Sequence, residues 1–297
     1  GLNIRPFMEV PMRSAAVLAL LAACLLGGCA PAPVEPVPLS ADREAALATA
    51  AAIDQTLAGN HRAPGHADRD VYRHPKETLM FFGLREGMTV VEVWPGAGGW
   101  YTEILAPVLR DDGKYYAAQW DPTLESRFVQ QGLAAFREKL AARPDLYDRV
   151  VITALSSSNA YDIAPPGTAD LVLTFRNVHN WMAMGWAPQA FARMYDALKP
   201  GGILGVVEHR GDPRMPQDPK AVSGYVNADH VVELARAAGF ELLASSEINA
   251  NPNDTKDYEA GVWALPPTYR LKDQDRERYG SIGESDRMTL KFVKPAR

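Results

Sequence analysis

Residues 89–105 read TVVEVWPGAGGWYTEIL and combine an acid, a glycine turn and aromatic side chains. The apolar stretch 90–93, which carries Glu92, is typical of a strand, and the turn with Gly96 and Gly98 leads into a helical pattern. Glycine allows a sharp turn and lets a ligand approach the backbone closely. A helix N-terminus directs free N–H groups at whatever lies there. The segment therefore predicts a site for the nucleoside end of a cofactor.

The glycine spacing distinguishes two kinds of nucleotide site. A dinucleotide site has the pattern G-x-G-x-x-G, whereas this chain has E-V-W-P-G-A-G. That pattern resembles motif I of the class I S-adenosyl-L-methionine (SAM) methyltransferases, D/E-x-G-x-G-x-G. Trp94 replaces the first glycine, and Pro95 follows it. Trp94 could cover the cofactor or fill its space, and a turn that needs glycine for backbone reasons alone is the plain alternative.

Strand and helix patterns alternate after this turn. We expect strands at 115–119, 149–154, 169–175, 203–208, 240–245 and 288–293, and helices at 123–142, 188–198 and 228–238. Such alternation predicts a parallel sheet with helices on both faces. ALKPGGIL and AGFELL, before the fifth and sixth strands, are common elements of the methyltransferase family. Over about residues 75–295 the resemblance implies an α/β, Rossmann-like class I methyltransferase fold with a seven-stranded, mostly parallel sheet and an antiparallel last strand.

The chain is also similar to a bacterial group of predicted methyltransferases. That group shows R-D-x-Y-R-H-P and E-x-W-P-G-x-G-x-W-Y-T-E segments, both of which occur here. Within this group the Trp94-Pro95 pair is a subgroup trait rather than damage to the motif.

The resemblance implies SAM as the cofactor, bound beyond the carboxyl ends of the strands. Gly96 and Gly98 would line its methionine and ribose parts, with Pro95 and Trp94 beside them. Glu92 would orient the turn or meet the methionine ammonium through water. Adenine would lie near residues 156–159, where the acid often found in the family is missing.

An acid after the second strand would hold the two ribose hydroxyls. We favour Asp121 for this role, or Gln119 if the strand ends earlier, because two hydroxyls need a bidentate acceptor. An Asx-Pro turn is the alternative interpretation of Asp121.

Aromatic faces attract a sulfonium cation by about 0.5–2 kcal/mol. Trp94, Trp100, Tyr101 and Trp181 are candidates for this contact. We expect at least two of the four to serve only in core packing.

His179, just past the fourth strand, is the best-placed general base, and His209 past the fifth strand is second. A single histidine is more often structural than catalytic. Asn177 could bind cofactor or substrate, or cap the strand end. Arg73 and the adjacent histidine could fold over the site, or form a surface salt bridge with a nearby acid. We find no H-E-x-x-H, no G-x-S-x-G and no metal-binding spacing, and expect no metal.

Two irregular insertions, 211–225 and 249–287, are expected to build the substrate pocket, because long loops inside a compact domain are usually functional. The second insertion carries Asn251, Asn253, Asp254 and Tyr258.

The N-terminal residues are expected to be a leader. Arg13 precedes an apolar run at 15–26, which is short for a membrane span but suits a secretory signal. LGGC at 26–29 resembles the lipobox of bacterial lipoproteins and implies cleavage before Cys29 and its acylation, whereas LAAC at 21–24 is a weaker match. We expect upstream residues and signal at 1–29, a Pro-rich tether at 30–40, a helical extension at 41–74 and the methyltransferase-like domain at 75–297.

Composition narrows the partners. The net charge of −5 and the absence of a basic run argue against a nucleic-acid partner. Both cysteines of the chain lie in the leader, so the remainder has no disulfide and no cysteine nucleophile.

These observations predict a SAM-dependent methyltransferase acting on an unidentified small-molecule acceptor. The leader predicts a lipid-anchored protein of the bacterial envelope facing the periplasm, while SAM is made in the cytoplasm. The alternative is therefore a non-catalytic envelope lipoprotein that keeps the fold and binds a small ligand. A nicotinamide dehydrogenase is third, because G-x-G-x-x-G is missing.

Overall fold

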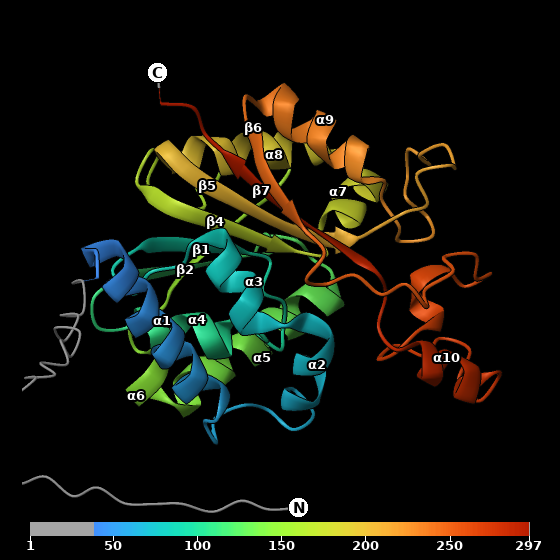
Figure 1. Cartoon of the computed structure of the whole chain (residues 1–297), viewed down its shortest axis with the longest axis horizontal. Coiled ribbons are helices and arrows are strands. Elements are labelled where there is room, and N and C mark those ends of the chain that lie inside the picture. The colour runs from blue at the N-terminus through green and yellow to red at the C-terminus, as the bar shows by residue number, and fades with distance from the viewer. Residues whose placement is uncertain (1–38, 297) are drawn as a thin grey trace, which may run out of the picture. The chain divides into compact units, whose positions relative to one another are not determined.

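The computed structural model describes residues 39–296 (Figure 1). Cys29, the expected leader and most of the expected tether lie outside the described residues. Within residues 39–296, no helix has the length and apolar character needed to cross a membrane.

One seven-stranded sheet organises the described chain, in the order β3-β2-β1-β4-β5-β7-β6. β1 to β5 pair in parallel, and β7 runs antiparallel to both β5 and β6. The predicted seven-stranded, mostly parallel sheet and its antiparallel last strand are confirmed. The strands are β1 (Thr89–Val93), β2 (Lys114–Gln119), β3 (Val151–Ala154), β4 (Ala169–Phe175), β5 (Leu198–His209), β6 (Glu241–Ser246) and β7 (Arg287–Val293).

Helices cover both faces of the sheet because alternate strand residues point to opposite faces. Val90 belongs to one core with α1, α3 and α4, whereas Val91 and Val93 belong to a second core with α7, α8 and α9. Figure 1 shows these two helical layers on either side of the strands. The helices are α1 (Ala41–Leu57), α2 (Asp70–Arg73), α3 (Pro75–Phe82), α4 (Thr102–Leu109), α5 (Arg127–Ala142), α6 (Pro144–Tyr147), α7 (Val178–Met184), α8 (Ala187–Ala197), α9 (Ala228–Ala238) and α10 (Arg276–Ile282).

One helix begins later than predicted because of local capping, and several short helices were not predicted. The helix expected from residue 123 begins at Arg127, because the Ser126 side chain caps it and residues 121–123 form a hydrogen-bonded turn. The helices α2, α6, α7 and α10 were not predicted, since four to seven residues give no periodic pattern.

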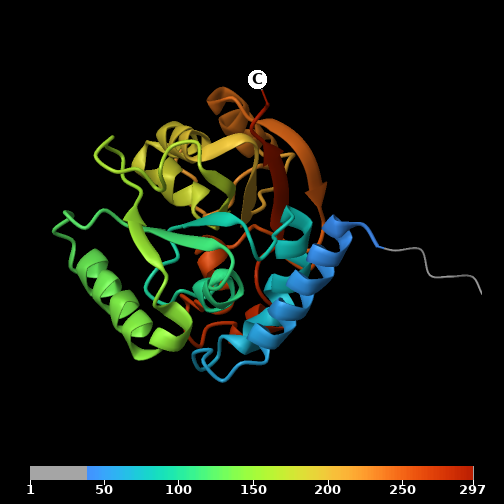
Figure 2. The ribbon, with the colours of Figure 1, turned by 90° about the vertical axis from the view of Figure 1, so that its left-hand side faces the viewer.

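The N-terminal helical segment shares the core of the sheet. α1 packs along α3 and α4 (Figure 2). Its Ile53 is fully buried in the same core as Val90. Residues 41–74 therefore help to support the glycine turn, which leads directly into α4.

Glu103, in the first turn of α4, joins this segment to the domain. Its buried carboxylate accepts hydrogen bonds from the Ala63 N–H at 2.9 Å and from His66 Nδ1 at 3.0 Å, and pairs with Lys139 of α5. Burial raises the pKa of Glu103, but these hydrogen bonds outweigh burial and hold the pKa at about 2. The ionised carboxylate is therefore the form that the folded chain stabilises.

Replacing Glu103 by glutamine is expected to lower the free energy of unfolding at pH 7 by about 2–3 kcal/mol. The contribution of Glu103 is complete above its ordinary pKa of 4.5 and is lost as pH falls toward 2. Urea unfolding of wild type and Glu103→Gln at pH 7 and pH 3 measures this, with exposed Glu138→Gln as the control. If the free energy of unfolding fell by the same amount from pH 7 to pH 3 in wild type and in Glu103→Gln, the stabilising role of the ionised Glu103 carboxylate would be contradicted.

Candidate functional site

The turn after β1 uses left-handed backbone at three positions. Trp94 has a φ of 52°, Gly96 of 74° and Gly99 of 55°. This conformation suits glycine but costs a residue such as tryptophan about 1–3 kcal/mol. The Trp94 N–H donates to the carbonyl of Ala118 at 2.7 Å, which holds the turn beside β2.

The outer side of the turn is open. A Cβ added at Gly96 would meet no atom within 4 Å, and one added at Gly98 would meet only the His66 ring, at 3.7 Å. The turn therefore leaves room for a ligand to approach its backbone, as the sequence predicted.

Glu92 lies on the inner side of this unit. Its buried carboxylate accepts hydrogen bonds from the hydroxyls of Tyr115 at 2.5 Å and Thr102 at 3.4 Å, and burial raises its pKa to about 7. Glu92 thus ties β1 to β2 and to the start of α4. This placement fits an orienting role and keeps the carboxylate inside the fold.

A cavity of about 500 Å³ lies at the carboxyl ends of β1, β2 and β3, and we call it the β1–β3 cavity. Trp94 forms one wall, where its Nε1–H donates to the carbonyl of Leu155 at 3.2 Å and its ring meets Trp186 edge-on. The wall residues include Trp94, Trp120, Asp121, Leu155, Ser156 and Trp186. Trp94 therefore borders open space and does not fill it.

Asp121 and Gln119 take different places at the end of β2. Gln119, the last strand residue, is buried and donates from Nε2 to the carbonyl of Gly96 at 2.9 Å, so it supports the glycine turn. Asp121 lines the β1–β3 cavity and also accepts from the Thr123 N–H at 2.9 Å. Burial raises the pKa of Asp121, but hydrogen bonds from Thr123 and neighbouring hydroxyls outweigh it and leave the pKa below its ordinary value.

Three of the four aromatic candidates do not line the β1–β3 cavity. Trp100 is buried and packs under the guanidinium of Arg73, 4.4 Å from the ring centroid. Tyr101 stacks on Phe175 with ring centroids 3.6 Å apart, and Trp181 is fully buried in the core. The structure thus places Trp100 and Tyr101 away from this cavity, because the turn that leads into α4 directs them toward α2 and β4.

Asn177 joins the strand ends at the point where the strand order reverses. Its side chain is buried and donates from Nδ2 to the carbonyl of Val93 at 2.9 Å and to Thr174 Oγ1 at 3.1 Å. Ligands of open α/β sheets bind at such a switch point. Asn177 acts there as a brace between β1 and β4.

On the other side of this brace, Glu208 orients two histidines. The fully buried carboxylate of Glu208 accepts from the His179 N–H at 3.1 Å and from the His209 N–H at 2.7 Å. It also lies 3.0 Å from His179 Nδ1. A carboxylate on Nδ1 fixes the tautomer and leaves Nε2 to accept a proton.

His209 lines the same region in a neutral state. Its Nδ1 lies 2.5 Å from Ser285 Oγ, and its ring centroid is 5.3 Å from that of His179. Burial lowers the pKa of His209 well below 6.5, and the positive charge of nearby arginines lowers it further.

A second cavity of about 260 Å³ lies at the ends of β4 and β5 and the start of β7, and we call it the β4–β7 cavity. Arg73 lines this cavity and is 3% exposed, whereas the adjacent His74 does not line it. The polar wall includes Arg69, Arg73, Arg176, His179, His209 and Arg287. The sequence assigned no role to Arg69, Arg176, Arg287 or Glu208.

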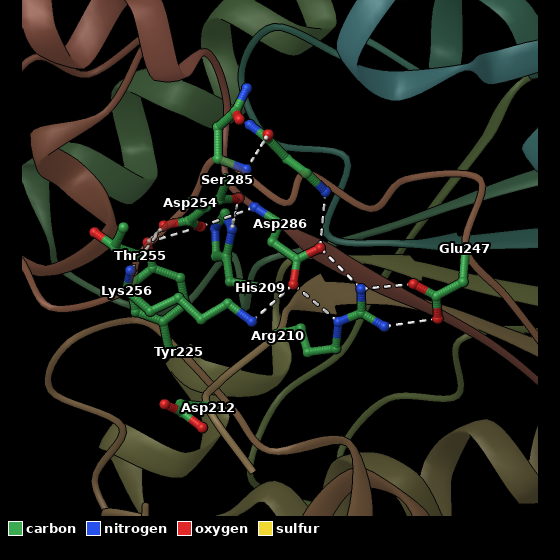
Figure 3. Close-up of polar contacts among 12 residues, drawn as sticks. His209, Arg210, Asp212, Tyr225, Glu247, Asp254, Thr255, Lys256, Ser285 and Asp286 are labelled. Carbon is green, nitrogen blue, oxygen red and sulfur yellow. Dashed lines mark hydrogen bonds and ion pairs between the residues drawn. The ribbon is translucent and has the colours of Figure 1, made fainter. Parts of the chain in front are cut away.

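The second insertion completes this cavity, whereas the first insertion does not line it. Residues 262–263 and 266–268, together with Ser285, come from the second insertion. Figure 3 shows how the insertions are held: the Tyr225 hydroxyl donates to Asp254 at 2.9 Å, and Asp254 accepts from the Asp286 N–H at 2.8 Å. Arg210 joins Asp286 to a further acid, Glu247. Asp254 therefore supports the pocket without lining it.

Donor atoms of His179, Glu208 and His209 lie within 4.8 Å of one another, a spacing that could hold a metal ion. The neighbouring guanidinium groups repel a cation, since like charges interact strongly in a partly buried site. Nδ1 of each histidine already has a hydrogen-bonding neighbour. The arrangement suits proton transfer better than metal binding.

No protein-family model matches the chain, and no curated protein matches it. Among solved structures, a SAM-dependent methyltransferase from Aquifex aeolicus is similar with 16% identity and a TM-score of 0.52, covering 82% of this chain and 98% of that one. The [4+2]-cyclase SpnF is similar with 18% identity and a TM-score of 0.53, covering 88% of this chain and 99% of that one. One of these two neighbours is named for methyl transfer and the other for cyclisation, so the likeness concerns the fold and not one reaction. The described chain has the Rossmann-like fold seen in SAM-dependent methyltransferases.

Proposed function

We propose that the protein is a SAM-dependent methyltransferase that acts on a small-molecule acceptor. The observation that carries this proposal is the β1–β3 cavity beside the open glycine turn, with an ionised Asp121 at the end of β2. Its volume of about 500 Å³ lies within the range of about 300–1,000 Å³ typical of small-molecule sites.

The residues present suit the parts of SAM. The carboxylate of Asp121 can accept from both ribose hydroxyls. The indoles of Trp94, Trp120 and Trp186 offer flat apolar walls for adenine. The open backbone at Gly96 and Gly98 leaves room for the methionine part.

His179 is the proposed general base. Bound SAM supplies a methyl carbon on a sulfonium, to which an acceptor lone pair adds as the carbon–sulfur bond breaks and S-adenosylhomocysteine leaves. His179 lines the β4–β7 cavity and takes the acceptor's proton on Nε2, and Glu208 stabilises the resulting imidazolium. We place His209 second because it lacks such a carboxylate on Nδ1 and faces Ser285 instead.

Calorimetry is expected to show that the wild-type protein binds both SAM and S-adenosylhomocysteine. Gly98→Trp is expected to weaken this binding more than tenfold, because the new ring occupies the open side of the turn. Gly98 does not require left-handed backbone, so the substitution changes the space and leaves the fold intact. Gly87→Trp is the matched control, since Gly87 is equally unobstructed but precedes β1. Failure of the wild-type protein to bind either compound at millimolar concentration would overturn the proposal.

Replacing His179 by glutamine is expected to lower turnover by about 10²–10⁴-fold while leaving SAM affinity unchanged within twofold. Glutamine can still donate to Glu208, so the substitution removes the base and preserves the fold. Formation of S-adenosylhomocysteine with a protein-free metabolite extract as acceptor source measures turnover, and His230→Gln on the surface of α9 is the control. Unchanged turnover in His179→Gln would exclude the assigned role.

We also propose that the protein is lipid-anchored in the bacterial envelope, on the strength of the apolar run at 15–26 and the LGGC segment. Two acyl chains would hold it, since each buried methylene contributes about 0.8 kcal/mol. Cys29→Ser is expected to move the protein from the membrane fraction to the soluble fraction, as followed by immunoblotting. A wild-type protein missing from the membrane fraction would contradict the proposal.

A further inference from the structure

The β4–β7 cavity has far more positive than negative charge on its walls. Arg69, Arg73, Arg176 and Arg287 converge there from three separate parts of the chain. Arginine is rarely buried without a partner, because a buried and unpaired charge is costly. The number of negative groups that neutralise these arginines therefore determines whether the cavity can bind an anionic ligand.

Glu284 is the carboxylate that pairs with these arginines. Arg69 Nε lies 2.5 Å from its Oε1, Arg287 donates from Nη2 to its Oε2, and Arg73 Nε is 4.0 Å from Oε2. Within residues 39–296, the Arg176 side chain forms no ion pair and no hydrogen bond. Glu208 forms no ion pair with these arginines among the described residues, and its oxygens accept from His179 and from backbone N–H groups. One carboxylate thus serves three guanidinium groups, and the fourth has no ion-pair partner among the described residues.

Several guanidinium donors in this cluster have no acceptor. Nε of Arg73, and Nε and Nη1 of Arg287, are buried and without a hydrogen-bond partner among the described residues. The side chains of Arg73 and Arg287 are each 3% exposed. Burial lowers the pKa of Arg176 to about 10, and repulsion from Arg287 and Arg69 adds to this effect. These arginines line the cavity, and three of their donor atoms have no acceptor in the described part of the chain.

The fold holds these donors in place at a further cost. Arg176 follows β4 with a φ of 59°, a left-handed conformation that costs a non-glycine residue about 1–3 kcal/mol. Arg73 is fixed over the ring of Trp100. A strained Arg176 without an ion pair, together with unsatisfied donors on the buried Arg73 and Arg287, indicates a binding site rather than a stabilising cluster.

We propose that the β4–β7 cavity binds an oxyanion group, a carboxylate or a phosphate, carried by the methyl acceptor. Guanidinium groups bind such oxyanions in a bidentate manner, which would satisfy the free donors. That the oxyanion belongs to the methyl acceptor rests on the proposed function, in which His179 lines this same cavity and must reach the acceptor as its base. The arginines bind the acceptor through its oxyanion, and a separate O–H or N–H group of the acceptor is methylated.

The alternative ligand for these arginines is the carboxylate of SAM itself. We favour the acceptor because the two cavities share no wall residue and lie on opposite sides of the Asn177 brace. An experiment that measures oxyanion binding and SAM binding separately distinguishes the two sources.

The test uses inorganic phosphate and succinate as probes, with sodium chloride at matched ionic strength as the control for screening. Both calorimetry and the thermal unfolding midpoint report binding without any need for turnover. We expect phosphate or succinate to bind the wild-type protein and raise its midpoint above that in chloride. Binding of neither probe, with SAM binding intact, would overturn this inference and leave the proposed function standing.

Arg176→Met is expected to weaken oxyanion binding roughly tenfold or more, because it removes a charged, bidentate donor. It is also expected to raise the midpoint of the free protein, because it removes an unpaired charge at the same backbone conformation. Arg236→Met on the exposed surface of α9 is the matched control. Unchanged oxyanion affinity in Arg176→Met would overturn the proposal, and Arg176→Lys, which keeps the charge and loses the fork, provides a second test with an intermediate loss expected.

SAM affinity of Arg176→Met separates the two sources of the oxyanion. We expect this affinity to stay within twofold of the wild-type value. A loss of SAM affinity equal to the loss of phosphate affinity would assign the arginines to the cofactor and overturn the acceptor assignment. A wild-type protein that binds phosphate but no SAM would overturn the proposed function while the oxyanion site stands.

Discussion

The candidate site depends on the shared attraction of Arg69, Arg73 and Arg287 for one buried carboxylate, Glu284. Burial raises the pKa of Glu284, but these guanidinium groups outweigh it and hold the pKa at about 2, so the carboxylate stays ionised. The contact joins residues separated by more than 200 positions, the segment before α3 and the start of β7. The single negative charge of Glu284 is shared by three arginines. It therefore holds them in place while the cluster keeps a net positive charge. The N-terminal extension therefore contributes residues of its own, Arg69 and Arg73, to the candidate site.

Local sequence patterns explain why the sheet and the glycine turn could be predicted. β4 and α9 have the predicted bounds, since an apolar run defines the strand and Gly239 ends the helix in a left-handed conformation. The place of Asp121 follows from the family resemblance, which implies an acid after the second strand, and in the structure Asp121 lines the β1–β3 cavity. The directions of Trp100 and Tyr101 could not be predicted, since a helix start does not reveal which neighbour each ring meets.

The arginine cluster has little sequence signal because its members meet only in the folded chain. Arg69 and Arg73 are four residues apart, a spacing that can place two side chains on one helical face. Arg176 and Arg287 have no such local relation, and each one alone is typical of a solvated surface residue. The sequence pattern around Glu208 likewise predicts only that this residue belongs to an apolar strand. Its role follows only from the backbone N–H groups and the imidazole around it.

Trp94, at a position where the motif that this segment resembles has glycine, borders the β1–β3 cavity and does not close it. The strained backbone of Trp94 is offset by its hydrogen bond to Leu155 and by edge contacts with Trp181 and Trp186. These contacts fix the indole as a wall of the β1–β3 cavity, where a flexible side chain could have collapsed inward. The sheet edge thus presents a rigid aromatic cavity on one side of Asn177 and a cationic cavity on the other. The two cavities therefore differ in chemistry, and the proposed methyl transfer would use the first for the adenine of SAM and the second for an anionic acceptor.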